Sequence, residues 1–369
     1  MTKKLGMILI LVGIGAMAAA APRTVFPGAE WEEATPESQG IAGLKLKEAV
    51  EALGRSVGSD GARELVMVRH GRIIWKGDNI DKRHGIWSAT KSFTSTVLGL
   101  LIAEGKCSLE TRVAEVLPEL EAHYPEVTLK HLTTMTSGYR ALGDETAGDY
   151  KHGPSSTPFA PHPKPLFRPP GSQYAYWDSA MNLLGLVLTR IAAEPMEELF
   201  QRRVAGVIGM KHWDWGDYAT VDGLVVNGGA GNGNKHVFIS ARDLARFGYL
   251  FLRQGQWKGR QLVPKDWVAE ATRVQVPATI PWAHPESGID GRGVYGFNWW
   301  RNGVKPGGAR QFPGAPEGMF WAAGHNNNRC FVIPEWDMVI VRLGLDGKAR
   351  EEVWDNFFVG IRSSIVESR

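Results

Sequence analysis

The chain has 369 residues, of which 43% are hydrophobic and 22% are charged, the composition of an ordinary globular protein. Its formal net charge is +3, which becomes +1 (3 − 2) without Lys3 and Lys4. This balance argues against nucleic acid or an anionic membrane surface as a partner, because both attract proteins with concentrated positive charge.

The first 21 residues have the pattern of a secretory signal peptide. Two lysines precede an apolar run from Leu5 to Ala16, and a stretch of alanines ends at Ala21. A basic start, a short apolar run and small residues before the cleavage point are the parts of such a peptide. The run is shorter than the ~20 apolar residues of a membrane span. We therefore expect an exported protein, periplasmic or secreted, with residues 22–369 as its mature domain and no stable membrane insertion.

The first elements expected in the mature chain are a helix, a hairpin and a second helix. Apolar residues along one side predict the first helix over residues 44–53. The β-favouring runs 64–68 and 73–75, joined by a short link that contains glycine, predict a hairpin. An apolar stripe predicts the second helix over residues 89–104, and Gly105 ends it.

The middle of the chain, about residues 109–245, alternates helical patterns with loops. Its loop 151–165, within the Pro-rich stretch 151–170, holds so many prolines that helix and central strand are excluded, and we expect a surface flap. His152 and His162 of this loop could be considered metal ligands. No third ligand stands at a suitable spacing, so we expect no metal site there.

The last part of the chain returns to β-favouring runs after two short helices and closes with a helix. The helices are expected at 245–252, 266–272 and 351–366, and the strands at 296–300, 319–322, 330–333 and 338–343.

Strands at both chain ends with helices between them predict an α+β fold. One antiparallel sheet from both chain ends would be flanked by helices, and a helical lobe, approximately residues 86–245, would be inserted in the middle. We expect the functional site in a cleft between sheet and lobe. Cys107 and Cys330 could pair in an exported protein, but two cysteines so far apart in the sequence favour free thiols.

The strongest chemical signal is the segment Trp-Ser-Ala-Thr-Lys, residues 87–91, at the start of the second predicted helix. Residues three apart share a helix face, so the hydroxyl of Ser88 is expected beside the amine of Lys91. The positive end of the helix favours negative charge that develops at Ser88. A serine needs a base to act as a nucleophile, and lysine can serve. The alternative is a helix cap with a solvated lysine, because Ser-x-x-Lys also occurs by chance.

Two further segments support the chemical interpretation. Tyr176 follows a Pro-Gly turn and stands at the entrance of a helix, so its hydroxyl can project, whereas Asp178 could simply cap that helix. Gly324 stands where one β-favouring run ends. It permits close approach of the backbone, whose N–H groups could face an oxyanion.

These motifs, in this order, resemble the serine β-lactamase and penicillin-binding protein superfamily. The resemblance is to its class C β-lactamase-like branch, which also holds esterases, D-amino-acid peptidases and oligomer hydrolases. It covers about residues 35–366. The segments that carry it are 86–93, 131–138, 170–185, 228–231 with 240–244, and 324–325 with 331–334 and 339–343.

The resemblance implies a catalytic role for three side chains. Ser88 would attack the acyl carbonyl, while Lys91 and Tyr176 would share the proton transfers that activate Ser88 and later a water. Neither a metal nor an organic cofactor is implied.

The resemblance also implies how the substrate is held. The oxyanion hole would combine the N–H of Ser88 with one N–H from Asn326, Asn327 or Asn328. Residues 324–325, with the runs 331–334 and 339–343, resemble the third motif of the family. His325 would take the place of the basic residue of that motif, where it could contact Tyr176 or the substrate.

Two positions depart from the family pattern and change the expected substrate. Asp178 replaces an asparagine, and an ionised carboxylate cannot donate a hydrogen bond to a substrate carbonyl. His325 replaces a lysine and is mostly neutral at neutral pH, which disfavours clamping of a substrate carboxylate. We therefore expect a serine hydrolase for a small-molecule ester or amide, with no nucleic-acid partner. Two alternatives stay open: a β-lactamase or D,D-carboxypeptidase acting on β-lactams or peptidoglycan peptides, and a catalytically silent binding relative.

Overall fold

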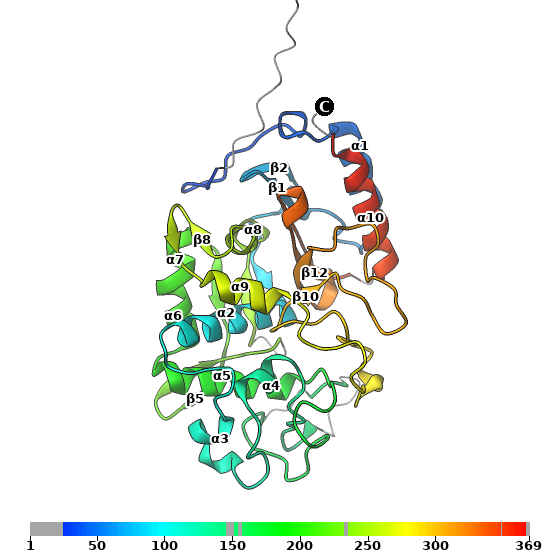
Figure 1. Ribbon diagram of the computed structural model, residues 1–369. Coiled ribbons are helices and arrows are strands. Elements are labelled where there is room, and N and C mark those ends of the chain that lie inside the picture. The colour runs from blue at the N-terminus through cyan, green and yellow to red at the C-terminus, as the bar shows by residue number, and fades with distance from the viewer. Residues whose placement is uncertain (1–24, 145–150, 154–156, 232–234, 348, 367–369) are drawn as a thin grey trace, which may run out of the picture.

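The computed structural model describes residues 25–144, 151–153, 157–231, 235–347 and 349–366. The predicted signal peptide lies outside these ranges. A six-stranded antiparallel sheet in the order β10-β11-β12-β13-β1-β2 forms the upper body of the molecule (Figure 1). Its strands are β1 (Glu64–Arg69), β2 (Arg72–Lys76), β10 (Trp300–Arg301), β11 (Phe320–Gly324), β12 (Asn328–Ile333) and β13 (Met338–Leu343).

The two ends of the chain meet in the centre of this sheet. β1 pairs with β13 so that Glu64 lies opposite Leu343 and Arg69 opposite Met338. Successive residues of β1 alternate between the two faces, as strand geometry requires. Leu65 joins one buried core and Val66 the other.

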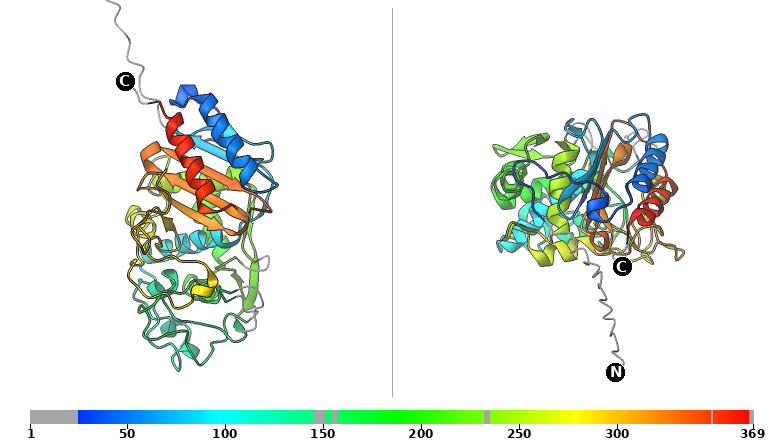
Figure 2. Two further views of the ribbon diagram at one scale, coloured as in Figure 1. Left: turned by 90° about the vertical axis from the view of Figure 1, so that its right-hand side faces the viewer. Right: turned by 90° about the horizontal axis from the view of Figure 1, so that it is seen from above.

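Helices cover both faces of the sheet. α1 (Gly43–Ser56) and α10 (Glu351–Ser364) lie side by side on one face (Figure 2). α8 (Ala241–Leu252) packs on the other face against β12 and β13. Gly248 allows this close approach, because a Cβ there would lie 2.6 Å from the sulfur of Cys330. With both faces covered, the strands are apolar almost throughout.

Below the sheet in Figure 1 lies α2, whose residues Thr90–Leu101 are all buried. The helices of this lower body are α2 (Thr90–Ala103), α3 (Val113–Val116), α4 (Leu129–Thr133), α5 (Asp178–Ala192) and α6 (Met196–Phe200), whereas α7 (Gly206–Ile208) and α9 (Lys265–Thr272) lie level with the sheet. Short sheets complete the fold: β3 (His84–Gly85) with β7 (Val237–Ile239) and β4 (Trp213–Trp215), β5 (Asp217–Val221) with β6 (Leu224–Asn227), and β8 (Gln256–Trp257) with β9 (Arg260–Gln261).

The α+β prediction is confirmed, but the strand expected over residues 296–300 is wrong. Only Trp300 and Arg301 pair with β11. Asn298 has a left-handed backbone (φ 59°) that breaks the extended run. Its carbonyl accepts from the Ser92 hydroxyl at 2.8 Å and its amide donates to the carbonyl of Thr133 at 3.0 Å, so this segment is tied to the helices below the sheet.

Two smaller expectations can be compared with the structure. Cys107 and Cys330 are both free thiols. Within the described ranges, no helix combines the length and the apolar character that crossing a membrane would demand.

Candidate active site

Ser88 lies in a tight turn that two close backbone approaches frame. A short 3-10 turn, Trp87–Ala89, leads into α2, and Trp87 has a left-handed backbone with φ 52°. A Cβ on Gly231 would lie 2.4 Å from the Ser88 nitrogen, and one on Gly324 would lie 1.9 Å from the Ile86 carbonyl oxygen. Only glycine fits at either position. The left-handed backbone of Trp87 is strained, because Trp87 is not a glycine, and strained residues of this kind are concentrated at functional sites.

Lys91 lies at the centre of the site, as the spacing to Ser88 predicts. Its Nζ donates to the Ser88 Oγ at 2.8 Å and lies 2.7 Å from Oδ1 of Asp178. The same Nζ is 4.5 Å from the ring centroid of Tyr176. Both Lys91 and Asp178 are buried, so the ion pair is shielded from water.

Asp178 supports the site from behind and does not line the pocket. It is the first residue of α5, and its Oδ2 lies 3.3 Å from Nδ1 of His152. Burial by itself would raise the pKa of Asp178, but the charges of Lys91 and His152 and hydrogen bonds from both outweigh it and lower that pKa below its ordinary value. Asp178 therefore stays ionised. We expected it to contact the substrate, but the structure places it behind Lys91, outside the pocket lining.

His152, considered from the sequence only as a metal ligand, is a residue of this site. Besides its contact with the Asp178 side chain, its carbonyl accepts from the Asp178 N–H at 2.7 Å. Its ring lies 5.6 Å from that of Tyr176, and it lines the pocket. The Pro-rich loop brings it there from 26 positions (178 − 152) before Asp178 in the chain. No local motif marks such a residue.

Tyr176 faces Ser88 from the opposite wall. Burial, followed by the charge of Asp178, raises the pKa of the phenol well above its ordinary value. The Ser88 side chain and the charge of Arg329 act in the other direction without reversing the shift. The ring stacks on Trp300 at a centroid distance of 6.3 Å. Tyr176 is thus a neutral phenol in the resting protein.

The edge of β11 presents backbone groups to the pocket. Asn302 donates to the carbonyl of Met319 and Trp300 pairs with Trp321, so odd-numbered residues of β11 direct their N–H groups towards β10. β10 ends at this pair, while Gly324 continues extended (φ −128°, ψ 167°). The alternation therefore directs the N–H of Ala323 and of His325 to the open edge, where both residues line the pocket.

The predicted oxyanion stretch lies outside the pocket. The Asn326 amide donates to the Leu345 carbonyl at 2.6 Å, and the Asn328 amide donates to the His325 carbonyl at 2.8 Å. Asn327 accepts from the indole of Trp354 at 2.8 Å. These amides hold the turn between β11 and β12. Asn326 and Asn327 both have a left-handed backbone, and neither lines the pocket, whereas Ala323, Gly324 and His325 do.

The His325 side chain lies exposed at the rim of the pocket. Its ring is 5.3 Å from that of Trp87. Partial burial, followed by the charge of His152, lowers the pKa of His325, so the ring is neutral at neutral pH. The structure thus brings Ser88, Lys91, Tyr176 and His325 together.

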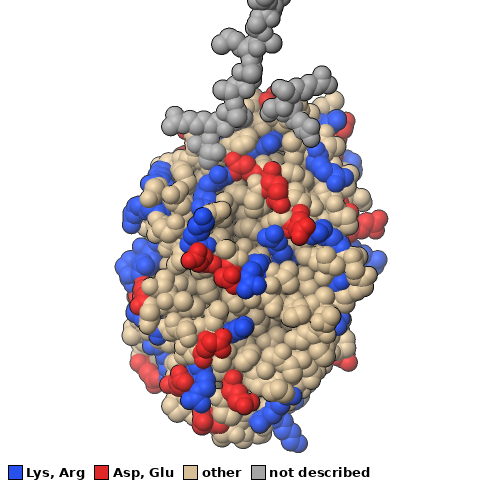
Figure 3. Space-filling view, in the orientation of Figure 1, with Lys and Arg blue, Asp and Glu red and all other residues tan. Residues whose placement is uncertain are grey.

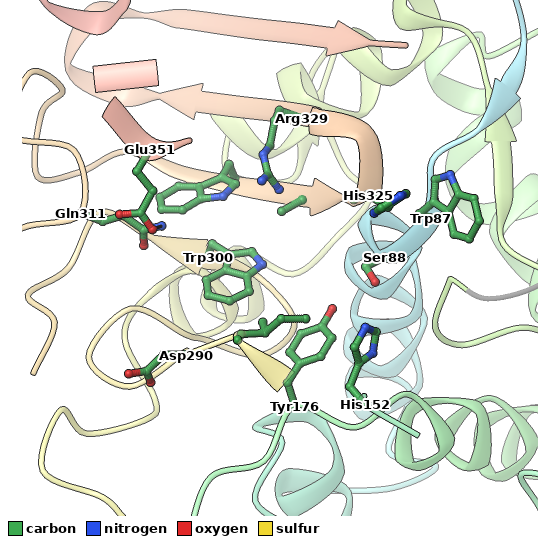
Figure 4. A pocket seen from close by; sticks show the side chains of 15 residues that line it. Trp87, Ser88, His152, Tyr176, Asp290, Trp300, Gln311, His325, Arg329 and Glu351 are labelled. Carbon is green, nitrogen blue, oxygen red and sulfur yellow. Dashed lines mark hydrogen bonds between the residues drawn. The ribbon is translucent and has the colours of Figure 1, made fainter. Parts of the chain in front are cut away.

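The pocket in front of Ser88 has a volume of about 470 Å³ (Figure 4). Aromatic side chains form much of its wall, namely Trp87, Tyr176, Trp300 and Trp321. Asp290, Arg329 and Glu351 add charged groups.

The face of the molecule shown in Figure 3 carries interspersed acidic and basic side chains. Within the described part of the chain, no three His, Cys, Asp or Glu side chains gather in a way that could hold a metal ion.

The chain is similar to known proteins both in sequence and in structure. The family model described as Beta-lactamase matches residues 46–345. An uncharacterised protein of Alkalihalophilus pseudofirmus is 21% identical over 275 residues, which are 71% of this chain and 73% of that protein. A putative 6-aminohexanoate-dimer hydrolase from Bacillus anthracis has a similar structure, with TM-score 0.60, 21% identity and coverage of 80% and 78% of the two chains. A family VIII carboxylesterase has TM-score 0.63, 18% identity and coverage of 87% and 97%.

Proposed function

Because the chain belongs to the beta-lactamase family of serine hydrolases, we propose that it cleaves an ester or amide through an acyl-enzyme on Ser88. The observation that carries this proposal is the 2.8 Å contact of the Lys91 amine with the Ser88 hydroxyl, with the Tyr176 phenol lining the same pocket. The names of two proteins with this fold, a carboxylesterase and a dimer hydrolase, support acyl chemistry of the same kind.

The electrostatics of the site favour a proton relay through neutral Tyr176. In one concerted transfer, the Ser88 proton moves to the Tyr176 oxygen while the Tyr176 proton moves to the leaving oxygen or nitrogen. The bond from the Ser88 Oγ to the acyl carbon forms as the bond to the leaving group breaks, so Tyr176 carries one proton throughout. Tyr176 need not become a phenolate, which its raised pKa disfavours. A water then replaces the leaving group, and the same transfers in reverse release the acid and restore Ser88.

Lys91 acts in this proposal as a fixed positive charge. Asp178 holds the ammonium group of Lys91 at 2.7 Å. The same ammonium group lies 2.8 Å from the Ser88 Oγ, on which negative charge develops as it loses its proton. A cation that is placed before the reaction stabilises this charge without reorganisation.

The oxyanion hole of this proposal consists of the N–H groups of Ser88 and His325. Ser88 precedes α2, whose positive end favours an anion. The strand edge directs the His325 N–H to the same pocket. Gly324 allows the two segments to approach, because any side chain there would meet the Ile86 carbonyl.

Steady-state kinetics with three substrates test the function. We expect turnover of 4-nitrophenyl butyrate and of the matching anilide, with nitrocefin the slowest. Tyr176→Phe is expected to lower kcat/KM by about 10²-fold or more, because it removes the proton relay. Tyr295→Phe is the matched control, since its buried hydroxyl contacts Asn298 at 3.3 Å outside the pocket lining.

The outcomes distinguish the alternatives. A preference for nitrocefin would identify a β-lactamase. Near-normal activity of Tyr176→Phe would exclude the relay. Failure of wild type on every acyl substrate, with ligand binding equal in wild type and Ser88→Ala, would favour a silent binding protein.

We also propose that the protein is exported after removal of residues 1–21. The support is the basic, apolar and small-residue pattern of that segment. Intact mass of the protein recovered outside the cytoplasm is expected to fit a chain that begins near Pro22. Recovery in the cytoplasm with Met1 retained would contradict export.

A further inference from the structure

Arg329 lines the pocket, and its guanidinium forms neither an ion pair nor a hydrogen bond with any of the described residues. It stands on β12 directly opposite Ala323 of β11, and both residues are partly exposed. Because the Ala323 side chain is small, the guanidinium can extend across β11 into the pocket (Figure 4). Among the described residues, no carboxylate and no other acceptor forms an ion pair or a hydrogen bond with this guanidinium.

The other charged groups of the pocket are already compensated. Asp290 pairs with Arg292 at 2.8 Å, and Glu351 pairs with Lys305 at 2.6 Å and accepts from Gln311 at 3.1 Å. The remaining cation beside Ser88, Lys91, has Asp178 at 2.7 Å. Glu351 acts on Arg329 electrostatically, without direct contact. The pocket therefore contains one positive charge that lacks a paired anion among the described residues.

A partly desolvated arginine without a partner is costly to maintain, and an anion would satisfy it. Its planar fork of N–H donors matches the two oxygens of a carboxylate. Arg329 is close enough to influence the phenol of Tyr176, so an anion bound there would lie beside the reacting groups. Trp300 and Trp321 flank the same space and suit an apolar or aromatic part of a ligand.

We propose that Arg329 binds a carboxylate of the substrate, so that the natural substrate is an ester or amide that also bears a free carboxylate. The proposal rests on the hydrolase function proposed above and specifies its substrate class. It also revises the expectation drawn from His325: that ring is neutral at neutral pH, and a residue on the neighbouring strand supplies the positive charge.

Two pairs of esters that differ only in one charge test the proposal. The acyl-side pair is 4-nitrophenyl hydrogen glutarate and its methyl ester, and the leaving-group pair is 4-acetoxybenzoate and its methyl ester. We expect wild type to prefer the acid of at least one pair by about tenfold or more in kcat/KM. Arg329→Gln is expected to remove that preference while the methyl esters react within about threefold of wild type. The matched control is Arg301→Gln, an arginine on β10 outside the pocket lining, which should keep the preference.

A different result would overturn the proposal in a recognisable way. If Arg329→Gln lowered kcat/KM equally for the acids and for their methyl esters, Arg329 would act on Tyr176 and not on the substrate. Absence of any acid preference in wild type, for either pair, would exclude the carboxylate.

A binding measurement separates this proposal from the hydrolase function. Calorimetry on Ser88→Ala protein is expected to show phenylacetate binding more tightly than phenylacetamide, and Ser88→Ala/Arg329→Gln should lose the difference. That result would support the carboxylate site even if wild type hydrolysed no ester, which would count against the hydrolase function alone. Equal binding of both ligands to Ser88→Ala would overturn the carboxylate site.

Discussion

Asp178 and Lys91 form a buried ion pair, with 2.7 Å between Oδ1 and Nζ, directly behind the Ser88 hydroxyl. An asparagine at this position, as in the pattern that the sequence resembles, would leave the ammonium group without a counter-charge. The carboxylate thus keeps a fixed cation next to Ser88. This charge is the reason why the proton relay is assigned to Tyr176 and not to the lysine.

Asp178→Asn is expected to destabilise the protein at pH 7 by about 3–5 kcal/mol, because it leaves the Lys91 charge buried and unpaired. The pKa of Asp178 is lowered in the folded protein, so its stabilisation is complete above the unfolded carboxyl pKa of about 4 and is lost as the pH falls further. Urea unfolding from pH 7 to pH 3 should therefore show the difference from wild type narrowing below about pH 4. Exposed Asp266→Asn is the control, and equal stability of Asp178→Asn and wild type at pH 7 would contradict the ion pair.

His152→Ala is expected to lower kcat for 4-nitrophenyl butyrate by about tenfold with little change in KM. The reason is the loss of a hydrogen bond to the charged Asp178, which is worth ~1.5–3 kcal/mol and orients the carboxylate that positions Lys91. His152→Asn should recover part of the activity, because an amide can still donate. His162→Ala, in the same loop but outside the pocket lining, is the control. An equal effect of both alanine variants would indicate a general disturbance of the loop.

Gly324→Ala is expected to reduce kcat by about 10²-fold or more. The added Cβ would lie 1.9 Å from the Ile86 carbonyl oxygen, so either β11 or the turn that holds Ser88 must shift and separate the two N–H groups of the oxyanion hole. Gly28→Ala is the control, because a Cβ there has its nearest neighbour at 4.0 Å. Activity of Gly324→Ala within about threefold of wild type would exclude this strand edge from the oxyanion hole.

His70→Asn is expected to change how stability depends on pH, at a distance from the active site. Burial, followed by the charges of Arg69, Arg253 and Arg72, lowers the pKa of His70 to about 4. In the unfolded chain His70 is protonated below about pH 6.5, whereas in the folded chain it stays neutral down to about pH 4. The free energy of unfolding of wild type therefore falls by up to about 3 kcal/mol as the pH falls from 6.5 to 4. Asparagine tolerates the backbone φ of 50° and cannot titrate here. Parallel stability curves for the two proteins over this range would contradict the shift.

The parts of the fold that depend on local periodicity could be predicted from the sequence. The hairpin at β1 and β2, the helix α2 and the run of β12 and β13 follow from the patterns of apolar residues alone. The pairing of Ser88 with Lys91 needs only helix geometry, because both residues belong to one turn of chain.

The contacts that depend on long-range packing could not be predicted. His152 reaches Asp178 only because the Pro-rich loop folds back on α5, and Arg329 enters the pocket only because Ala323 lies opposite it. That Asn326–Asn328 lie outside the pocket lining could not be predicted for the same reason. Which N–H groups face Ser88 depends on how β11 pairs with β10, and that pairing leaves no mark in the sequence of β11 itself.

The intact-protein mass after incubation with a fluorophosphonate tests whether Ser88 is an activated nucleophile. The probe forms a bond to a serine oxygen only where the oxygen is activated and accessible. We expect wild type to gain the mass of one adduct and Ser88→Ala to gain none. An unmodified wild type, or an adduct that persists in Ser88→Ala, would show that Ser88 is not the activated nucleophile.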